Sequence, residues 1–436
     1  MTEASLNRTL RRVDWRFLPH LEDEPRTACF AEGRLQADVQ RVLGTAPEPP
    51  WDLAVVVDPS ERTLREAHAG LRQGGAVYAE WRRPTPAARV RARLEAADFI
   101  HVEIYWPWPW HRGLPRFWYP LGSARAAGAI LRRRRPGTAR LDRLQRAAVA
   151  AAKLGVLPPL AAVAAKPPAT ALQPLVLLTG GSHSLNKAVG VDPNDGHVIK
   201  FARTAEQDGA LVHEHTVLSL LEQEHPDLGG VPRPLALGRR CGRVAVAESP
   251  VFGRPLVVDA ATAEQVTDWL VALAGHAPPR PRSTWWERLV AEPLRAFERD
   301  FGAVVDRTEL HRAQTLLERV PDLPLVVEHR DVAPWNLVAA EAGGIGVLDW
   351  ESSEPEGLPL LDLVYFLEQA GVELHVRERC IERYCAALSL PLETVTPLRA
   401  LCWIVHARSE RRRLEVSQLA GSSFVRLLRA ELAQAP

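Results

Sequence analysis

The sequence predicts two consecutive domains: an α/β domain with a parallel-rich sheet, and then an α+β domain made of two lobes. Three observations lead to this fold class. The 436 residues exceed what one ordinary hydrophobic core organises. Apolar strands alternate with amphipathic helices in the first part, as in parallel sheets. A β-rich segment then precedes a mostly helical remainder. The expected boundaries are 1–145 for the α/β domain, 146–174 for a helical, Pro- and Ala-rich linker, 175–255 for a small lobe and 256–436 for a helical large lobe.

The first domain shows strand and helix patterns in turn. Strands are predicted at 51–58 (WDLAVVVD), with the pattern of a buried strand, at 76–81 (AVYAEW), and at 100–106 (IHVEIYW), where the sequence alternates as in a strand. A helix with a serine cap and closing glycines is predicted over 60–75, and a second helix over 89–99. This order indicates parallel strands joined by helical crossovers.

The second domain changes pattern near residue 175. Short strands, a PNDG hairpin turn and one amphipathic helix are predicted before residue 255. Helices dominate afterwards, over 261–275, 284–320 and 373–432. The small lobe is therefore expected to be β-rich and the large lobe helical.

Composition excludes several classes of protein. The formal net charge is +1, so no global field favours nucleic acid as a partner. The N-terminus lacks the apolar region of a secretory signal, and no run of 18 apolar residues predicts a membrane span. The five cysteines show no metal-binding spacing and are expected to be reduced. We therefore expect a cytoplasmic protein.

The stretch VVEHRDVAPWNLV, residues 326–338, carries the strongest chemical pattern. His329, Arg330 and Asp331 are followed by Asn336 five residues after the aspartate, and Asp349 follows in GVLDWE. These residues match the H-R-D-x-x-x-x-N catalytic signature of protein kinases. Asp331 is expected to be the base that faces an acceptor hydroxyl, and His329 to fix the loop. Asn336 and Asp349 supply the oxygen ligands that Mg²⁺ prefers.

Lysine is scarce in this chain, which makes one lysine informative. Of 54 basic residues only Lys153, Lys166, Lys187 and Lys200 are lysines. Lys200 ends the apolar strand HVIK, a position that suits contact with nucleotide phosphates. The alternative is a strand-end lysine that reaches into water.

Glu214, on the following helix, is the expected ion-pair partner of Lys200, with Glu206 as the weaker candidate.

Two further segments are candidates for nucleotide contact. Gly180, Gly181 and Ser182 lie in the loop TGGSHSLNK, where glycines allow the backbone to approach phosphates closely. This loop is not G-x-G-x-x-G, and a plain hairpin loop is the alternative. In VAVAESPV, backbone groups near Glu248 and Val251 are expected to meet a purine.

Residues 175–436 resemble the aminoglycoside phosphotransferase and choline kinase branch of the protein-kinase-like fold. The resemblance rests on HRDVAPWN, on LDWE in place of the protein-kinase DFG, and on GLPLLDLVYF. Asp362 lies only thirteen positions after Asp349, which leaves no room for a long activation segment. The resemblance implies ATP or GTP as donor, Mg²⁺, a small-molecule acceptor with a hydroxyl group, and Asp362 as a buried acid that supports the catalytic loop.

The catalytic loop departs from the family pattern at Ala333-Pro334-Trp335. Trp335 either walls the acceptor pocket or packs into the protein.

The first domain resembles the second half of a class I S-adenosylmethionine methyltransferase. The resemblance rests on DLAVVVD, LRQGGAVYAEW and the helix that ends in AADF. The stretch RTACFAEGRLQ has only Gly33 where such enzymes need a Gly-rich turn. We therefore expect a degenerate domain without its cofactor.

The leading hypothesis is a small-molecule kinase that acts on a sugar-like or natural-product acceptor. A pseudokinase joined to a pseudo-methyltransferase, serving as a scaffold, is the alternative, and an active methyltransferase is a third hypothesis.

Overall fold

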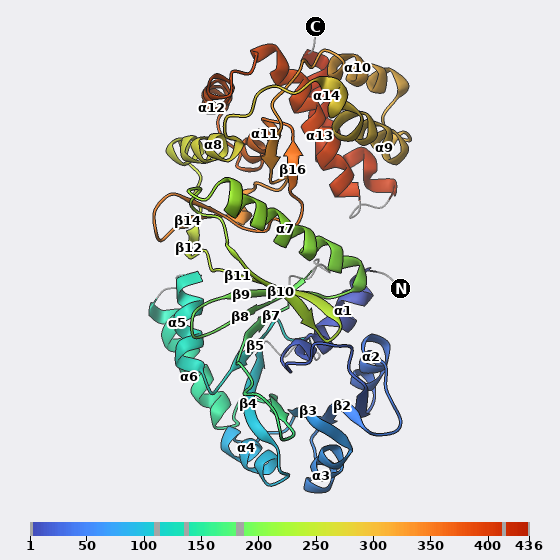
Figure 1. Ribbon diagram of the computed structural model, residues 1–436, viewed down its shortest axis with the longest axis vertical. Coiled ribbons are helices and arrows are strands. Elements are labelled where there is room, and N and C mark those ends of the chain that lie inside the picture. The colour runs from blue at the N-terminus through green and yellow to red at the C-terminus, as the bar shows by residue number, and fades with distance from the viewer. Residues whose placement is uncertain (1–2, 109–113, 135–138, 180–186, 412–415, 435–436) are drawn as a thin grey trace. The chain divides into compact units, whose positions relative to one another are not determined.

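A computed structural model describes residues 3–108, 114–134, 139–179, 187–411 and 416–434 (Figure 1). The chain divides into two compact units. The first comprises Met1–Ser219 and Pro232–Phe252, and the second comprises Leu220–Val231 and Gly253–Pro436. The predicted small lobe therefore belongs, for the most part, to the same unit as the N-terminal residues.

The first unit is organised around one sheet, which has eleven strands in the described residues. Their order across the sheet is β1-β2-β3-β6-β4-β5-β7-β8-β9-β11-β10. The strands are β1 (Thr27–Phe30), β2 (Trp51–Val57), β3 (Leu71–Trp81), β4 (Ile100–Trp108), β5 (Phe117–Pro120), β6 (Leu160–Ala165), β7 (Val176–Leu178), β8 (Lys187–Val191), β9 (Val198–Ala202), β10 (Pro234–Arg240) and β11 (Arg243–Glu248).

The parallel arrangement expected from the sequence holds only at one side of this sheet. Strands β1, β2 and β3 are parallel. Strand β6 lies antiparallel to both β3 and β4, so β4 runs in the same direction as β3. From β4 to β10 the described neighbours are antiparallel. The expectation of a parallel-rich sheet concerned residues 1–145, and it was right for β1 to β3 and wrong for the pairing of β4 and β5. The antiparallel β8 and β9 agree with the hairpin predicted within 175–255.

The assignment of residues 146–174 to a linker was wrong for most of this segment. Helix α6 extends to Lys153, and the run LAAVAA forms β6 between β3 and β4, with all six residues buried. The prolines that suggested a linker flank the strand at 158–159 and 167–168, where they interrupt no ladder hydrogen bond.

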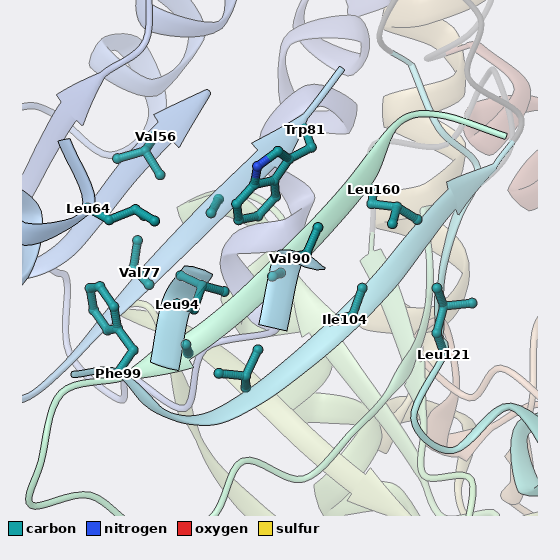
Figure 2. Close-up of a cluster of buried hydrophobic side chains, with 14 of the residues drawn as sticks. Val56, Leu64, Val77, Trp81, Val90, Leu94, Phe99, Ile104, Leu121 and Leu160 are labelled. Atoms are coloured by element: carbon teal, nitrogen blue, oxygen red, sulfur yellow. The ribbon is translucent and has the colours of Figure 1, made fainter. Parts of the chain in front are cut away.

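Helices cover both faces of the sheet in the first unit. On one face α3, α4, α5 and α6 pack on side chains from β2, β3, β4 and β6, as Figure 2 shows for Leu64, Val90 and Leu94. On the other face η1 and α2 pack on the alternate residues of the same strands. The helical segments are α1 (Glu3–Val13), η1 (Asp14–Phe17), α2 (Arg34–Val42), α3 (Glu61–Gly70), α4 (Ala87–Glu95), α5 (Ala124–Arg134), α6 (Ala139–Lys153), η2 (Ala205–Gln207) and α7 (Asp208–Glu224), which continues into the second unit.

Helix α3 begins as predicted and ends early. The Ser60 hydroxyl accepts the Thr63 N–H at 3.1 Å, which confirms the serine cap. The helix ends at Gly70, and residues 71–75 begin β3 instead of extending the helix.

One sheet joins the N-terminal region to the strands predicted for the small lobe. Strand β5 pairs with β7 through Phe117 and Leu178 and through Trp118 and Leu177. Because the ladder is continuous, residue 175 is not a division between two cores. The sequence places a boundary there because the pattern of strands and helices changes, but the hydrogen bonding continues.

The second unit is mostly helical, with short strands that carry the catalytic motif. Helix α13 is its central element and contacts α9, α10, α11 and α14. The helices are α8 (Ala260–Ala274), η3 (Arg282–Thr284), η4 (Glu287–Ala291), α9 (Glu292–Phe301), α10 (Arg307–Leu317), η5 (Pro334–Asn336), α11 (Leu361–Gln369), α12 (Leu374–Ala387), η6 (Leu392–Thr394), α13 (Val395–Arg411), η7 (Val416–Gly421) and α14 (Ser423–Gln434). The strands are β12 (Gly253–Pro255), β13 (Val326–Glu328), β14 (Leu337–Ala340), β15 (Ile345–Val347) and β16 (Glu354–Gly357).

All five cysteines are free, and four of them are buried. In the described part of the chain no single helix is long and apolar enough to cross a membrane, although one bent pair, Leu374–Ala387 with Leu392–Arg411, passes by length and composition alone.

Candidate active site

Lys200 lies in the middle of β9, flanked by strands on both sides. It is opposite Val189 on β8 and opposite Val246 on β11. Its side chain is only 7% exposed, which is rare for lysine unless the charge is paired. Strand register therefore holds the backbone of this lysine, and its ammonium group must find its partners inside the unit.

Two carboxylates contact the Lys200 ammonium group. Glu214 Oε1 on α7 lies 2.6 Å from Nζ, which confirms the predicted ion pair, and Glu206 is on the exposed η2. Glu248 Oε2, at the end of β11, lies 2.9 Å from the same nitrogen. Both acids are buried. Sequence reasoning missed the second contact, because it considered only the backbone of Glu248.

Burial and charge act in opposite directions on Glu248. Burial raises the pKa of its carboxyl group, and the Lys200 ammonium lowers it. Glu214 raises the same pKa as a like charge, and Lys187 lowers it by a smaller amount. The net pKa shift is upward, so the second acid near Lys200 is held in an environment that disfavours its charge.

The predicted contacts of Lys200, the loop before β8 and the segment after β11 with a nucleotide all stay predictions. Gly180, Gly181 and Ser182 lie outside the described residues. Val251 is half-buried after the end of β11, and its backbone contact with a purine stays a prediction. The Ser249 N–H donates to the Arg233 carbonyl at 2.8 Å, which ties the segment before Val251 to the strand region before β10.

In the second unit, Asp362 anchors the catalytic loop. Its Oδ2 accepts the His329 N–H at 2.6 Å, and its Oδ1 accepts the Arg330 N–H at 2.8 Å. Arg330 has φ 64°, a left-handed conformation that is costly for a non-glycine residue. The two hydrogen bonds hold the backbone in this conformation. The expectation that Asp362 is a buried acid supporting the loop is confirmed.

Asp362 shares its environment with another acid. Burial, and then the Glu328 carboxylate, raise the pKa of Asp362 to about 8, while the two N–H donors lower it. The Arg330 guanidinium lies 3.3 Å from Glu328 and 3.6 Å from Glu354. Arg330 therefore neutralises acids beneath the loop, a structural contact that agrees with its place in the motif.

His329 is buried and fixes the loop through both ring nitrogens. Its Nδ1 accepts the Asp331 N–H at 3.2 Å, so the neutral ring carries its proton on Nε2. Nε2 lies 3.0 Å from the Leu348 carbonyl, which accepts that proton. The ring also packs edge-on against Trp350, with centroids 4.6 Å apart. These contacts match the structural role expected of His329.

The Asp331 carboxylate is contacted at both oxygens. Asn336 Nδ2 donates to Asp331 Oδ2 at 2.8 Å and to the Asp331 carbonyl at 2.9 Å. The Tyr365 hydroxyl donates to Oδ1 at a longer 3.4 Å. Tyr365 stacks on His406, with ring centroids 3.7 Å apart and planes 4° apart. Sequence reasoning missed Tyr365, because it lies inside the apolar run LVYFL.

The structure brings the two predicted metal ligands to the same end of a small ladder. Leu337 pairs with Val347 across β14 and β15, and the Leu348 N–H donates to the Asn336 carbonyl at 2.9 Å. Asn336 comes directly before β14, and Asp349 comes two residues after the end of β15. Because the two strands are antiparallel, both residues lie at the same end of the ladder. The Asn336 Nδ2 group donates to Asp331, and the amide oxygen Oδ1 is the atom of this side chain that can bind a cation. Among described residues no cluster of three or more His, Cys, Asp or Glu is suited to a metal, so this carboxylate and amide pair is the oxygen donor set to consider.

Trp335 does not pack into the protein. Its side chain is 64% exposed, while the preceding Val332 and Ala333 are fully buried. The packing alternative for Trp335 was therefore wrong, and the tryptophan is presented beside Asn336 at the surface of η5.

The chain is similar to a known protein family and to several solved structures. The profile of the phosphotransferase enzyme family (APH) matches residues 174–401. Choline kinase LicA from Streptococcus pneumoniae is similar at 12% identity and a TM-score of 0.42, over 59% of this chain and 92% of that chain. Aminoglycoside phosphotransferase APH(3'')-Id from Streptomyces rimosus is similar at 20% identity and a TM-score of 0.34, over 49% of this chain and 89% of that chain. No curated protein matched the sequence significantly.

The matched segment contains Lys200, Glu214, Asp331, Asn336 and Asp349, and it covers more than half of the 436 residues. The chain therefore belongs to the phosphotransferase enzyme family.

Proposed function

We propose that the protein transfers the γ-phosphoryl group of ATP or GTP to a hydroxyl group of a sugar-like or natural-product acceptor. The arrangement of Asp331 carries this proposal. Its carboxylate is oriented by Asn336, its loop is fixed by Asp362, and it is only half-buried. Such a group suits a base that accepts a proton from a substrate hydroxyl.

The proposed reaction is a direct transfer between two oxygens. The acceptor oxygen forms a bond to the γ-phosphorus while the bond from that phosphorus to the bridging β-γ oxygen breaks. The acceptor proton passes to the Asp331 carboxylate, and the nucleoside diphosphate leaves. Lys200 would bind phosphate oxygens of the donor, since its ammonium group is oriented by Glu214 and Glu248.

Mg²⁺ fits the oxygen donors at the end of the β14 and β15 ladder. Asn336 Oδ1 and the Asp349 carboxylate would hold it, since hard cations prefer such ligands. When bound, the ion would neutralise phosphate charge. Asp349 has φ 72°, a strained conformation of the kind that persists where the surrounding structure enforces it.

For the N-terminal region we propose a supporting role without a cofactor of its own. Only Ala31, Glu32 and Gly33 separate β1 from α2, which leaves no Gly-rich turn. Two aromatic side chains of η1 pack in one core cluster on the sheet. Trp15 stacks on Tyr78 with ring centroids 3.9 Å apart, and Phe17 stacks on Phe201, the residue that follows Lys200 on β9. These contacts support a role in bracing the strand that carries the lysine.

A labelled-phosphate assay tests the proposal. Wild-type protein, Mg²⁺ and γ-labelled ATP or GTP would be incubated with a panel of hydroxyl-bearing sugars and natural products. We expect label transfer to at least one acceptor, and a loss of roughly a hundredfold or more in Asp331→Asn, which removes the base. Nucleotide affinity should be retained in that variant, since Asp331 faces the acceptor.

Equal transfer by wild type and Asp331→Asn would contradict the assigned role. Binding of nucleotide without transfer to any acceptor would favour the scaffold alternative. Binding of S-adenosylmethionine would revive the methyltransferase alternative.

A further inference from the structure

The remaining lysines have different surroundings, and one of them lies near Lys200. Lys166 closes helix α3, since its Nζ donates to the carbonyls of His68 at 2.8 Å and Leu71 at 2.6 Å. Lys153 is exposed in the last turn of α6. Lys187 is the first residue of β8 and half-buried. In a chain whose basic residues are otherwise arginines, the choice of lysine at 187 calls for a physical reason.

Strand register places Lys187 on the same face of the sheet as Lys200. Lys187 is opposite Ala202, and Val189 is opposite Lys200. Directly opposite residues of an antiparallel pair share a face, and residues two apart on one strand share it too. Lys187 and Lys200 therefore project from neighbouring strands toward one side.

Glu248 lies on that face as well. It is two residues beyond Val246, which is opposite Lys200 on β11. The 2.9 Å contact between Glu248 and Lys200 agrees with this register. The positive charge of Lys187 also reaches Glu248, since Lys187 is one of the causes that lower the pKa of that acid. The face thus combines two lysines with the carboxylate of Glu248 and, from α7, that of Glu214.

Charge balance on this face bears on phosphate binding. Lys200 contacts two buried carboxylates, so the three groups together carry a net negative charge when both acids are ionised. A polyphosphate that approaches them is repelled unless another cation is close. Lys187 supplies that charge and makes the four groups neutral.

We propose that Lys187 is a second phosphate-binding cation, which acts together with Lys200 on the di- or triphosphate group of the nucleotide. This inference rests on the proposed nucleotide-dependent function and assigns it one more binding residue. The ammonium group would donate to phosphate oxygens, as a compact point charge suits a mobile polyphosphate. Lys200 would then remain oriented by Glu214 and Glu248 while Lys187 carries part of the phosphate contact.

Isothermal titration of the full-length protein tests the inference. The ligands are adenosine, ADP and ATP, or guanosine, GDP and GTP if wild type prefers guanine, each with Mg²⁺. We expect Lys187→Met to weaken binding of the di- and triphosphate by roughly tenfold, the loss of one charge-assisted hydrogen bond. The affinity for the nucleoside should stay the same, because it has no phosphate. Lys187→Arg should retain most of the affinity, and Lys153→Met should match wild type.

The outcomes separate this inference from the proposed function. Unchanged nucleotide affinity in Lys187→Met, while wild type binds tightly, overturns the role of Lys187 alone. An equal loss for nucleoside and nucleotide also overturns it, because it indicates a structural role. If Lys187→Met does not fold, Lys187→Gln is titrated in its place under the same criteria. A wild-type protein that binds no nucleotide overturns the proposed function and this inference with it.

Discussion

The surroundings of Lys200 and those of Asp331 are stabilised in different ways. Lys200 lies on a strand, and two side-chain carboxylates from other elements contact its ammonium group. Asp331 lies on a loop, and the loop is held because the Asp362 carboxylate accepts two backbone N–H groups. The first arrangement depends on charge balance inside a sheet, and the second depends on backbone geometry.

This difference determines which substitution each region tolerates. Two acids contact the one ammonium group of Lys200, so the loss of either acid leaves the lysine with an ion pair, whereas the loss of the lysine removes a partner from both acids. Beneath the Asp331 loop one acid serves two donors, so that acid has no substitute. We therefore expect the two regions to differ in whether the cation or the acid is indispensable.

The largest effect on stability is expected from Lys200→Met. The substitution removes the Lys200 ammonium group from the buried Glu214 and Glu248, and removing one partner of a buried ion pair typically costs about 3–5 kcal/mol. The measurement is urea unfolding followed by circular dichroism. A loss below about 1 kcal/mol would show that solvent or proton uptake already compensates the two acids.

Glu248→Gln is the matched substitution for that prediction. It leaves Lys200 paired with Glu214 and removes an acid whose pKa burial raises, so we expect the free energy of unfolding to change by less than about 1 kcal/mol. Adding Glu248→Gln to Lys200→Met should recover part of the lost stability. A Glu248→Gln variant as unstable as Lys200→Met would contradict the idea that the second acid is dispensable.

A smaller effect is expected from Asp362→Ala. The N–H groups of His329 and Arg330 would lose their acceptor in a buried site, at roughly 1–3 kcal/mol for each unsatisfied group. Removal of an acid whose pKa is raised by burial offsets part of this loss, so we expect about 2–4 kcal/mol in total from urea unfolding. Asp322→Ala is the control, because the exposed Asp322 accepts one backbone N–H at 2.7 Å and should cost much less. Equal losses for the two variants would argue against a special role of Asp362.

A pH-dependent effect at the lower end of the range for Asp362→Ala concerns His406, which stacks on Tyr365. Burial, and then the charge of Arg330, lower the pKa of His406 from its ordinary value of 6.5 to about 3. The unfolded chain therefore binds a proton between pH 6.5 and pH 3 that the folded chain does not bind. Stability contributed by neutral His406 is fully present above pH 6.5 and is lost as the pH falls, by about 2 kcal/mol at pH 5.

Unfolding curves at pH 7 and pH 5 measure this contribution of His406. His406→Gln should remove that part of the pH dependence, while His311→Gln, at an exposed position, should keep it. An unchanged difference between pH 7 and pH 5 in His406→Gln would assign the acid sensitivity to other groups.

The part of the site carried by a fixed spacing of polar residues was predictable from the sequence. The order and spacing of four residues match a known motif: His329, Asp331, Asn336 and Asp349. Asn336 and Asp349 lie close together because they flank one short hairpin, formed by β14 and β15. Glu214 was predictable because it lies on the first helix after the strand of Lys200.

The unpredicted parts depend on contacts between distant segments. Glu248 ends an apolar strand, and only the pairing of β11 with β9 shows that its carboxylate reaches Lys200. The hydroxyl of Tyr365 lies in an apolar helix, and its contact with Asp331 joins residues 34 positions apart. Strand β6 was missed because LAAVAA has one β-branched residue and proline neighbours, and its burial between β3 and β4 decides its structure.

A thermal-shift titration tests the central claim of a nucleotide-dependent phosphotransferase most directly. Wild-type protein would be measured with ATP, GTP and S-adenosylmethionine, each with and without Mg²⁺. A ligand at 100 times its Kd should add roughly 2.7 kcal/mol to stability. We predict a Mg²⁺-dependent shift with at least one of the two nucleotides and none with S-adenosylmethionine. No shift with either nucleotide, or a shift with S-adenosylmethionine alone, would contradict the account.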